Sequence, residues 1–258
     1  MKDQPTDTKP AMPNPATREE CPYRPAQPNR GRRWLRNIGL LVVAVIVFLV
    51  IEHFDIAMMR LRYAVIGDEP RGFLKHILNG FREFGQTLSV IVAIVIVVTY
   101  DRRWKTIIVS LLLAEIVGAM VYNSGKLLVE RYRPQIAIQE LADPPTKDAL
   151  EALSRFTSAD TWQGWQPGNT KAARQSFPSG HSAGAFILAG VLACFYPKSR
   201  AMLFTLATGC ALSRYLGAVH WLSDCWAGAV IGYAMAILTV NFCCRNKISP
   251  SQTATGTI

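Results

Sequence analysis

Blocks of apolar residues separated by polar segments dominate the hydrophobic pattern of the chain. About 17 to 25 apolar residues are enough for a helix to cross the hydrocarbon core of a bilayer. The blocks approach or reach that length, so the pattern predicts membrane-spanning helices. The predicted spans lie approximately at residues 38–58, 84–100, 106–124, 181–196, 202–219 and 225–243. We therefore expect an all-α fold, a polytopic membrane protein with a six-helix transmembrane bundle.

The polar segments at the two ends of the chain have little to bury. Residues 1–29 contain seven prolines among polar residues, so residues 1–33 are expected to form a disordered Pro-rich cytoplasmic tail. We do not expect a signal peptide here, because the first apolar block begins late and ends without a small-residue cleavage site. Residues 34–244 form the predicted six-span domain, with a long external loop at about 135–177, and residues 245–258 form a second cytoplasmic tail.

The excess of positive charge, 28 Lys and Arg against 18 Asp and Glu, lies largely in short clusters between the apolar blocks. Such clusters fix the orientation of membrane helices, so the charge does not indicate a nucleic-acid partner. The arginines within residues 30–36 are expected to hold the N-terminus in the cytoplasm. With six spans both termini are then cytoplasmic, in an inner or plasma membrane, and no internal repeat indicates a transporter of inverted halves.

The cysteines do not have the spacing of a metal site. None of the six cysteines pairs with another at zinc-ligand spacing near histidines, so we interpret them mainly as small apolar membrane residues and expect no metal or cofactor. Cys243 and Cys244 lie next to a membrane exit, where acylation is the alternative interpretation.

Residues 213–224 contain three side chains able to take part in chemistry, at the end of a long apolar block: Arg214, His220 and Asp224. If the fifth span continues as a helix beyond His220, Asp224 lies four residues on, within reach of the imidazole. A carboxylate that accepts a hydrogen bond from one ring nitrogen leaves the other nitrogen as a base or nucleophile. The spacing predicts an activated histidine beside an arginine, although a lone His-x-x-x-Asp pair is usually structural.

A second polar stretch ends the third span. Lys126 and Arg133 are seven residues apart, about two helical turns, which predicts that they share one helical face. Pro134 disfavours a helical conformation at Arg133, so the helix is expected to end there and to free the guanidinium for a ligand. A basic belt at a membrane exit is an equally good interpretation of this stretch alone.

A third stretch begins the fourth span, with Ser179, Gly180 and His181. Ser179 is a natural N-cap, Gly180 lets a ligand approach the backbone, and the free amides of a helix start favour phosphate. His181 would lie beside such an anion as a proton donor. An ordinary capped helix with an interfacial histidine is the alternative.

Together the three stretches supply fixed positive charges, neutral donors and two of the four histidines, which is what phosphoryl transfer requires. The pattern Lys126-x6-Arg133-Pro134, Pro178-Ser179-Gly180-His181 and Ser213-Arg214-x5-His220-x3-Asp224 resembles the three-part signature of the type 2 phosphatidic acid phosphatase family, which is related to the vanadium haloperoxidases. The resemblance covers about residues 106–243, and all of the motif positions match.

The resemblance implies a metal-independent phosphatase with a phosphohistidine intermediate. In such an enzyme His220 attacks phosphorus, Asp224 orients His220, and His181 protonates the leaving oxygen and later activates water. The residues that would hold the phosphate oxygens are Lys126, Arg133, Ser179, Gly180 and Arg214. Because one imidazole must be neutral and the other protonated, a bell-shaped pH profile is expected.

The expected substrate is a lipid phosphate or diphosphate of the phosphatidic acid, phosphatidylglycerol phosphate or polyprenyl diphosphate type. The alternatives are a non-catalytic lipid-phosphate binding or transport protein and a vanadate-dependent haloperoxidase, and the oligomeric state stays open. Glu115 lies inside the third span, where we favour a structural role over proton relay. Gly228 and Gly232 have the spacing that lets membrane helices pack closely.

Overall fold

The computed structural model describes residues 30–146, 148–167 and 171–246. Most of the two expected tails, residues 1–29 and 247–258, therefore lies outside the described residues. The first helix already begins at Arg30, inside the segment that was expected to be a tail.

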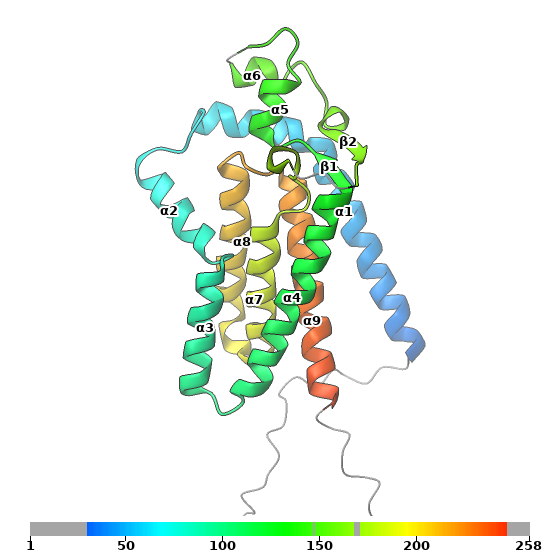
Figure 1. Cartoon of the computed structure of the whole chain (residues 1–258), viewed down its shortest axis with the longest axis vertical. Helices are drawn as coiled ribbons and strands as arrows, with labels where there is room; N and C mark the ends of the chain where they lie inside the picture. The colour runs from blue at the N-terminus through cyan, green and yellow to red at the C-terminus, as the bar shows by residue number, and fades with distance from the viewer. Residues whose placement is uncertain (1–29, 147, 168–170, 247–258) are drawn as a thin grey trace, which may run out of the picture.

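Five helices run side by side as a bundle (Figure 1). They are α3 (Thr87–Tyr100), α4 (Trp104–Leu128), α7 (Gly180–Phe195), α8 (Arg200–Leu216) and α9 (Leu222–Asn246). The central helix is α7, which packs against α4, α8 and α9 and is buried along most of its length. The apolar core between α4, α7 and α9 includes Leu111, Ile187 and Val240. The expected all-α membrane fold is confirmed.

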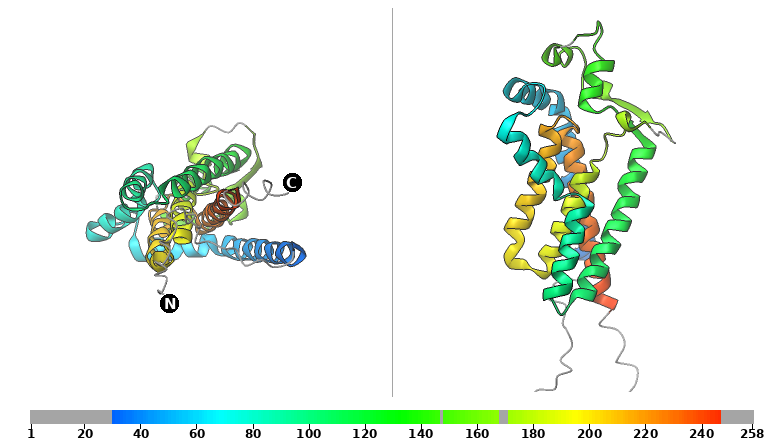
Figure 2. Two further views of the ribbon diagram at one scale, coloured as in Figure 1. Left: turned by 90° about the horizontal axis from the view of Figure 1, so that it is seen from below. Right: turned by 60° about the vertical axis from the view of Figure 1, so that its left-hand side comes forward.

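Two further helices precede this bundle. Helix α1 (Arg30–Ile66) projects away from the bundle over its first half (Figure 2, left), where side chains such as Val43 and Leu49 are exposed. Its second half turns inward, and Asp55 and Met59 are buried there. Helix α2 (Gly72–Glu83) packs against α8 and meets α3 at an angle of 58°. The start of α1 and the end of α9 lie at the same end of the bundle (Figure 1).

Helix length and composition support fewer membrane spans than the six expected. Within the described residues, three helices are long and apolar enough to cross a membrane, namely α1, α4 and α9, and the bent pair α2–α3 would be a fourth. Helix α7 has 16 residues and α8 has 17. A helix of that length is about 24 Å long, shorter than a hydrocarbon core of about 30 Å. Six spans are therefore not established by helix length and composition.

The segment expected as a polar loop is folded in its described residues, which we call the cap (residues 129–146, 148–167 and 171–177). Its elements are β1 (Val129–Arg131), α5 (Pro134–Glu140), α6 (Ala149–Ala152), β2 (Trp162–Trp165) and the short 3₁₀ helices η1 (Ala159–Thr161) and η2 (Ala172–Arg174). A third 3₁₀ helix, η3 (Pro197–Ser199), lies outside the cap and joins α7 to α8. Strands β1 and β2 pair antiparallel, with Val129 opposite Trp165. Leu153 and Phe156 of the cap share an apolar core with Met59 of α1 and Trp221. This shared core fixes the cap to one end of the bundle.

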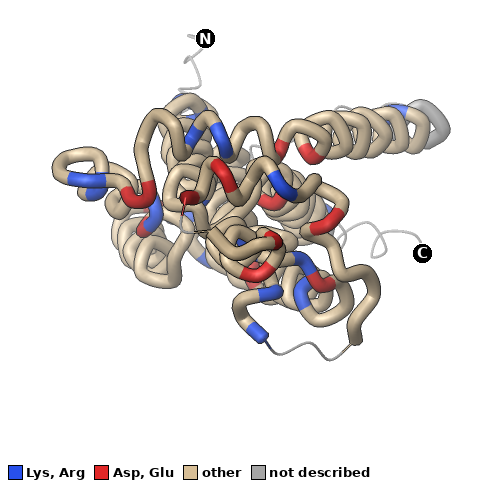
Figure 3. The backbone as a smooth tube through the Cα atoms, turned by 90° about the horizontal axis from the view of Figure 1, so that it is seen from above, with Lys and Arg blue, Asp and Glu red and all other residues tan. Residues whose placement is uncertain are grey.

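Acidic and basic residues are interspersed at the cap end of the molecule (Figure 3). Part of this pattern consists of ion pairs, because Arg174 lies 3.0 Å from Glu130 and 3.3 Å from Glu140. The described residues at this end therefore carry both signs of charge.

The close contact between α7 and α9 depends on two glycines, as their spacing predicted. A Cβ at Gly228 would collide with the backbone carbonyl of Ser179, and one at Gly232 with that of Ala183. We expect Gly228→Ala to destabilise the folded state by about 1–3 kcal/mol, because neither backbone has room to move. Thermal unfolding of the purified protein in detergent measures the effect.

Gly80→Ala is the matched control for Gly228→Ala. Gly80 lies in helix α2, and nothing lies within 4 Å of the position that its Cβ would take. The midpoint of thermal unfolding of the Gly80→Ala variant is expected to equal or slightly exceed that of wild type, since alanine is a better helix former than glycine. Equal midpoints for the two variants would contradict the packing argument.

Candidate active site

His220 lies in the turn between α8 and α9, as the predicted spans at 202–219 and 225–243 imply, so the condition of a helix that continues beyond His220 is not met. The chain reverses at Ala218, whose φ of 53° is uncommon for a residue with a Cβ. The amide of His220 donates to the carbonyl of Arg214 at 3.3 Å. The turn thus sets His220 directly against the end of α8 that carries Arg214.

The imidazole of His220 is held by a backbone carbonyl. Its Nδ1 lies 2.8 Å from the carbonyl oxygen of Ser176, whereas the nearer carboxylate oxygen of Asp224 is 3.8 Å away, too far for a direct hydrogen bond. A carbonyl oxygen only accepts, so Nδ1 must carry the proton. In the neutral ring, Nε2 then keeps its lone pair and can act as a nucleophile.

The protonation state of His220 follows from its surroundings. Burial lowers the pKa of His220 below its ordinary value of 6.5, and the nearby carboxylate of Asp224 opposes that shift. The imidazole is therefore neutral at pH 7. This is the form that a nitrogen nucleophile requires.

Asp224 lies in the first turn of α9 and is fully buried. Its Oδ2 accepts hydrogen bonds from the hydroxyl of Ser176 at 2.6 Å and from the amide of Trp221 at 3.0 Å. Its Oδ1 accepts from Arg131 at 2.5 Å. Asp224 is thus connected to His220 through Ser176, whose hydroxyl bonds the carboxylate and whose carbonyl bonds the imidazole.

The start of α7 brings a second histidine to the same place. Ser179 caps the helix as expected, its hydroxyl accepting from the amide of Ser182, and its own amide donates to the carbonyl of Asp224 at 3.1 Å. His181 follows in the first turn of α7. It lies within electrostatic range of His220, Arg214 and Lys126.

The basic residues of the second stretch, Lys126 and Arg133, lie on different secondary-structure elements and not on one helix. Helix α4 ends at Leu128 and the chain continues as β1, so the expectation that Lys126 and Arg133 share a helical face is wrong. Arg133 is in extended conformation as Pro134 predicted, with φ −68° and ψ 149°. The cause of the early helix end is the pairing of β1 with β2, which the sequence pattern did not reveal.

Lys126, Arg133 and Arg214 nevertheless converge. Lys126 interacts electrostatically with both arginines, and a Cβ built on Gly180 would lie 3.4 Å from its Nζ. Within the described residues, the Nε atoms of Arg133 and Arg214 are buried and have no hydrogen-bond partner. Burying an unpaired polar group costs about 1–3 kcal/mol. These donors are therefore arranged for an acceptor that the chain itself does not supply.

Sequence reasoning missed four buried residues beside Asp224: Asp55, Arg131, Ser176 and Ser223. Asp55 carried a usable signal, since it is a carboxylate inside the first predicted span, as Glu115 is inside the third. The Oε1 atom of Glu115 is buried without a hydrogen-bond partner among the described residues. The described part of the chain holds no group of three or more His, Cys, Asp or Glu arranged to bind a metal ion.

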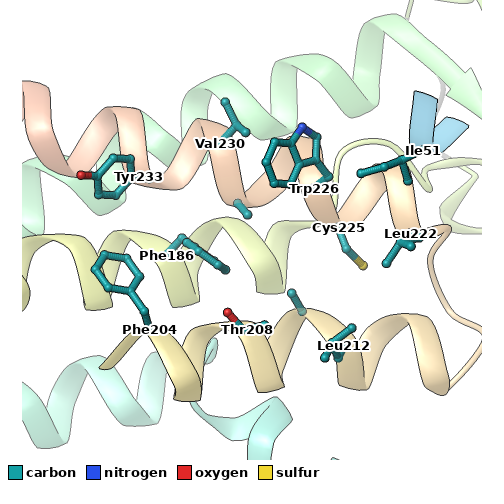
Figure 4. Close-up of a pocket in the computed structure, with 12 residues that line it drawn as sticks. Ile51, Phe186, Phe204, Thr208, Leu212, Leu222, Cys225, Trp226, Val230 and Tyr233 are labelled. Carbon is teal, nitrogen blue, oxygen red and sulfur yellow. The ribbon is translucent and has the colours of Figure 1, made fainter. Parts of the chain in front are cut away.

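An apolar cavity of about 450 Å³ lies between α1, α7, α8 and α9 (Figure 4). Phe204 and Tyr233 line one end of the cavity, while Leu222 and Cys225, on either side of Asp224 in the sequence, line the other end (Figure 4). The cavity and the polar site therefore share the first turn of α9.

Apolar helices with a histidine and arginine site at one end define an integral membrane protein with a buried polar centre. A family model described as the PAP2 superfamily matches residues 103–247, more than half of the chain. The chain belongs to this superfamily and is a membrane phosphatase of the PAP2 type. The resemblance stated from the motifs is confirmed.

The chain is similar to two solved structures. A transmembrane PAP2-type phosphatidylglycerolphosphate phosphatase from Bacillus subtilis has a TM-score of 0.50 and 17% identity over 82% of this chain and 98% of that chain. LpxE from Aquifex aeolicus has a TM-score of 0.49 and 20% identity, over 72% and 93% of the two chains. At 17% identity the likeness to the Bacillus subtilis protein concerns the fold alone.

Proposed function

We propose that this protein hydrolyses a lipid phosphate or diphosphate through a phosphohistidine on His220, without a metal ion. The observation that carries the proposal is the pair of buried guanidinium Nε atoms of Arg133 and Arg214, without partners among the described residues, together with the His220 imidazole whose Nδ1 is held by the Ser176 carbonyl. Burying N–H donors without acceptors is costly, and the oxygens of a phosphate group would supply the acceptors.

The proposed reaction has two steps. In the first, Nε2 of His220 attacks phosphorus, the P–N bond forms, and the P–O bond to the leaving group breaks as His181 gives its proton to the leaving oxygen. In the second, His181 takes a proton from water, whose oxygen attacks phosphorus, and the P–N bond breaks to release phosphate and neutral His220. Asp224 stabilises the positive imidazole formed between the steps.

The phosphate oxygens would be held by donors from three segments. Lys126 at the end of α4, Arg133 before α5 and Arg214 at the end of α8 supply the charge. Ser179 and Gly180 at the start of α7 supply the neutral donors of a helix N-terminus. Three separate segments can surround a tetrahedral group, which a single motif cannot do.

A lipid substrate is supported by the apolar cavity beside the site. Its lining of Phe186, Phe204, Trp226 and Tyr233 suits a hydrocarbon chain. Leu222 and Cys225 bring the cavity close to the phosphate donors, so one lipid can occupy both. Phosphatidylglycerol phosphate, the substrate class named for the Bacillus subtilis protein, belongs to the candidates.

We retain the proposed orientation, with both termini cytoplasmic and the site at the external face. The first turn of α1 and the last turn of α9 lie at the same end of the molecule, opposite the cap (Figure 1), which supports a common side for both termini. The division into tails at 1–33 and 245–258 and a membrane domain between them stays a proposal, with α1 beginning at Arg30 and α9 ending at Asn246.

Release of inorganic phosphate by the purified protein tests the proposed function. With EDTA present, we expect turnover of at least one of phosphatidic acid, phosphatidylglycerol phosphate and polyprenyl diphosphate, and faster turnover of long-chain than of short-chain phosphatidic acid. His220→Ala, purified in the same way, controls for contaminating phosphatases. No release by wild type from the whole panel would overturn the proposal and favour a binding or transport protein, while activity lost with EDTA would overturn metal independence.

A further inference from the structure

Three buried charged residues from distant parts of the chain meet behind the catalytic histidine. They are Asp55 of α1, Arg131 of β1 and Asp224 of α9, and their side chains are 0% exposed. Nη2 of Arg131 lies 2.8 Å from Asp55, and its Nη1 lies 2.5 Å from Asp224. Arg131 therefore bridges the two carboxylates.

The remaining contacts hold this bridge in place. Nε of Arg131 donates to the hydroxyl of Thr161 at 3.3 Å, and Nη1 also donates to the hydroxyl of Ser223 at 2.7 Å. The guanidinium lies 4.2 Å from the ring centre of Trp162 and 5.5 Å from that of Trp221. All three of its nitrogens are thus engaged by the protein, unlike the Nε atoms of Arg133 and Arg214.

Asp55 is held as firmly as Arg131. Its Oδ1 accepts from the amide of Ser223 at 3.1 Å, and its Oδ2 accepts from the hydroxyl of Ser223 and from Arg131. Asp55 thereby connects α1 to the first turn of α9, which carries Asp224. The matched family region begins at residue 103, so this connection comes from outside it.

We propose that Asp55 and Arg131 are positioning residues for the reaction of His220. Arg131 fixes the carboxylate of Asp224 against Ser176, and the carbonyl of Ser176 holds the imidazole. Asp55 also binds the guanidinium of Arg131, so the positive charge of Arg131 is divided between two carboxylates and does not fully neutralise the negative charge of Asp224. That charge is needed when His220 becomes positive on attacking phosphorus. The inference rests on the proposed function and names residues through which the same site works.

Stability alone is a poor explanation for this arrangement. Burying ionised groups has a desolvation cost that their attraction often fails to offset, and apolar replacements of similar volume are often neutral or stabilising. A role in holding a charge near a reacting group accounts for three charged side chains without solvent contact. It also accounts for the chain of bonds that leads from Asp55 to His220.

The proposal predicts a change in pH dependence with a definite sign. The charged and titratable groups that face His220 are Asp224, Arg133, Arg214 and His181. In Asp55→Asn, Arg131 would balance Asp224 more completely, so the positive form of His220 would be less stable. The pKa of His220 would then fall, and the acid limb of the kcat/KM profile would move to lower pH while kcat decreases.

Asp55→Asn in the full-length protein is the test, with dioctanoyl phosphatidic acid as the probe. We expect kcat to fall by about 10- to 100-fold, the range known for hydrogen-bond partners that orient metal-binding side chains, with little change in KM. Asp55→Glu, which keeps the charge, should restore part of kcat. Asp101→Asn is the control, because Asp101 pairs with Arg103 at the end of the bundle away from the cap.

An active wild type with an Asp55→Asn protein of unchanged kcat and pH profile would overturn this inference alone. A wild type without phosphatase activity would overturn the proposed function and the inference with it. Should the Asp55→Asn protein fail to fold, Ser223→Ala decides the question, since it removes only the hydroxyl that joins Asp55 and Arg131. In Ser223→Ala we expect a smaller decrease in kcat and a smaller shift of the acid limb of the kcat/KM profile to lower pH. The absence of both changes would count against the proposal.

Discussion

His220→Ala is expected to lower kcat by about 10⁴-fold or more, since removal of a catalytic nucleophile leaves only the binding contribution to the rate. The variant should also give no acid-labile phosphoenzyme, because it lacks the nitrogen on which the proposed phosphohistidine forms. Rapid acid quench with labelled substrate measures both quantities. Equal labelling of wild type and His220→Ala would exclude His220 as the nucleophile.

His181→Ala separates the two histidines. Without His181 the leaving oxygen has no proton donor, so hydrolysis of phosphatidic acid is expected to be slow. With p-nitrophenyl phosphate, whose leaving group needs no proton, the variant should still form phosphoenzyme but should not hydrolyse it efficiently. Normal turnover of both substrates would argue against a role of His181 in proton transfer.

Arg214→Gln is expected to lower kcat/KM by about 10²- to 10³-fold, the usual effect of removing a donor to a charged transition state. Arg214 is half-buried and its Nε has no partner among the described residues, so no internal ion pair is lost with it. Steady-state kinetics and vanadate inhibition measure the effect. We expect kcat/KM to fall and vanadate to inhibit the variant less strongly than the wild type.

Arg174→Gln is the matched control for Arg214→Gln. Arg174 lies on the cap, where it pairs with Glu130 and Glu140. Exposed ion pairs contribute little to stability, so neither the unfolding midpoint nor kcat/KM should change much. Equal losses in the two variants would show that loss of positive charge anywhere on this end lowers activity, which would contradict a specific phosphate site.

The helices of the bundle could be predicted from the sequence to within a few residues. Helix α7 was expected at 181–196 and lies at Gly180–Phe195, because Ser179 caps its start and Pro197 follows its end. The cap could not be predicted. Its helices are short, and its core is formed with Met59 and Trp221, far away in the sequence. Short elements stabilised by distant contacts leave no hydrophobic period to read.

The residues of the site also divide into those with a local sequence pattern and those brought together only by distant contacts. The motif residues, such as Arg214 and His220, stand at spacings that a sequence displays directly. Asp55 and Arg131 meet across 76 positions, and Arg131 and Asp224 across 93. No local pattern records such pairs, so only the folded structure brings them together. The relation of Asp224 to His220 also needed the structure, because it passes through Ser176.

The junction of α7 and α9 has a consequence for how the protein loses activity. The amide of Ser179 bonds the carbonyl of Asp224, and the backbone at Gly228 lies against the carbonyl of Ser179. The two histidine-bearing segments are thus joined to the closely packed pair of helices α7 and α9. Heat inactivation should accordingly coincide with unfolding of the bundle, so that detergents and lipids chosen to preserve the fold preserve the enzyme equally.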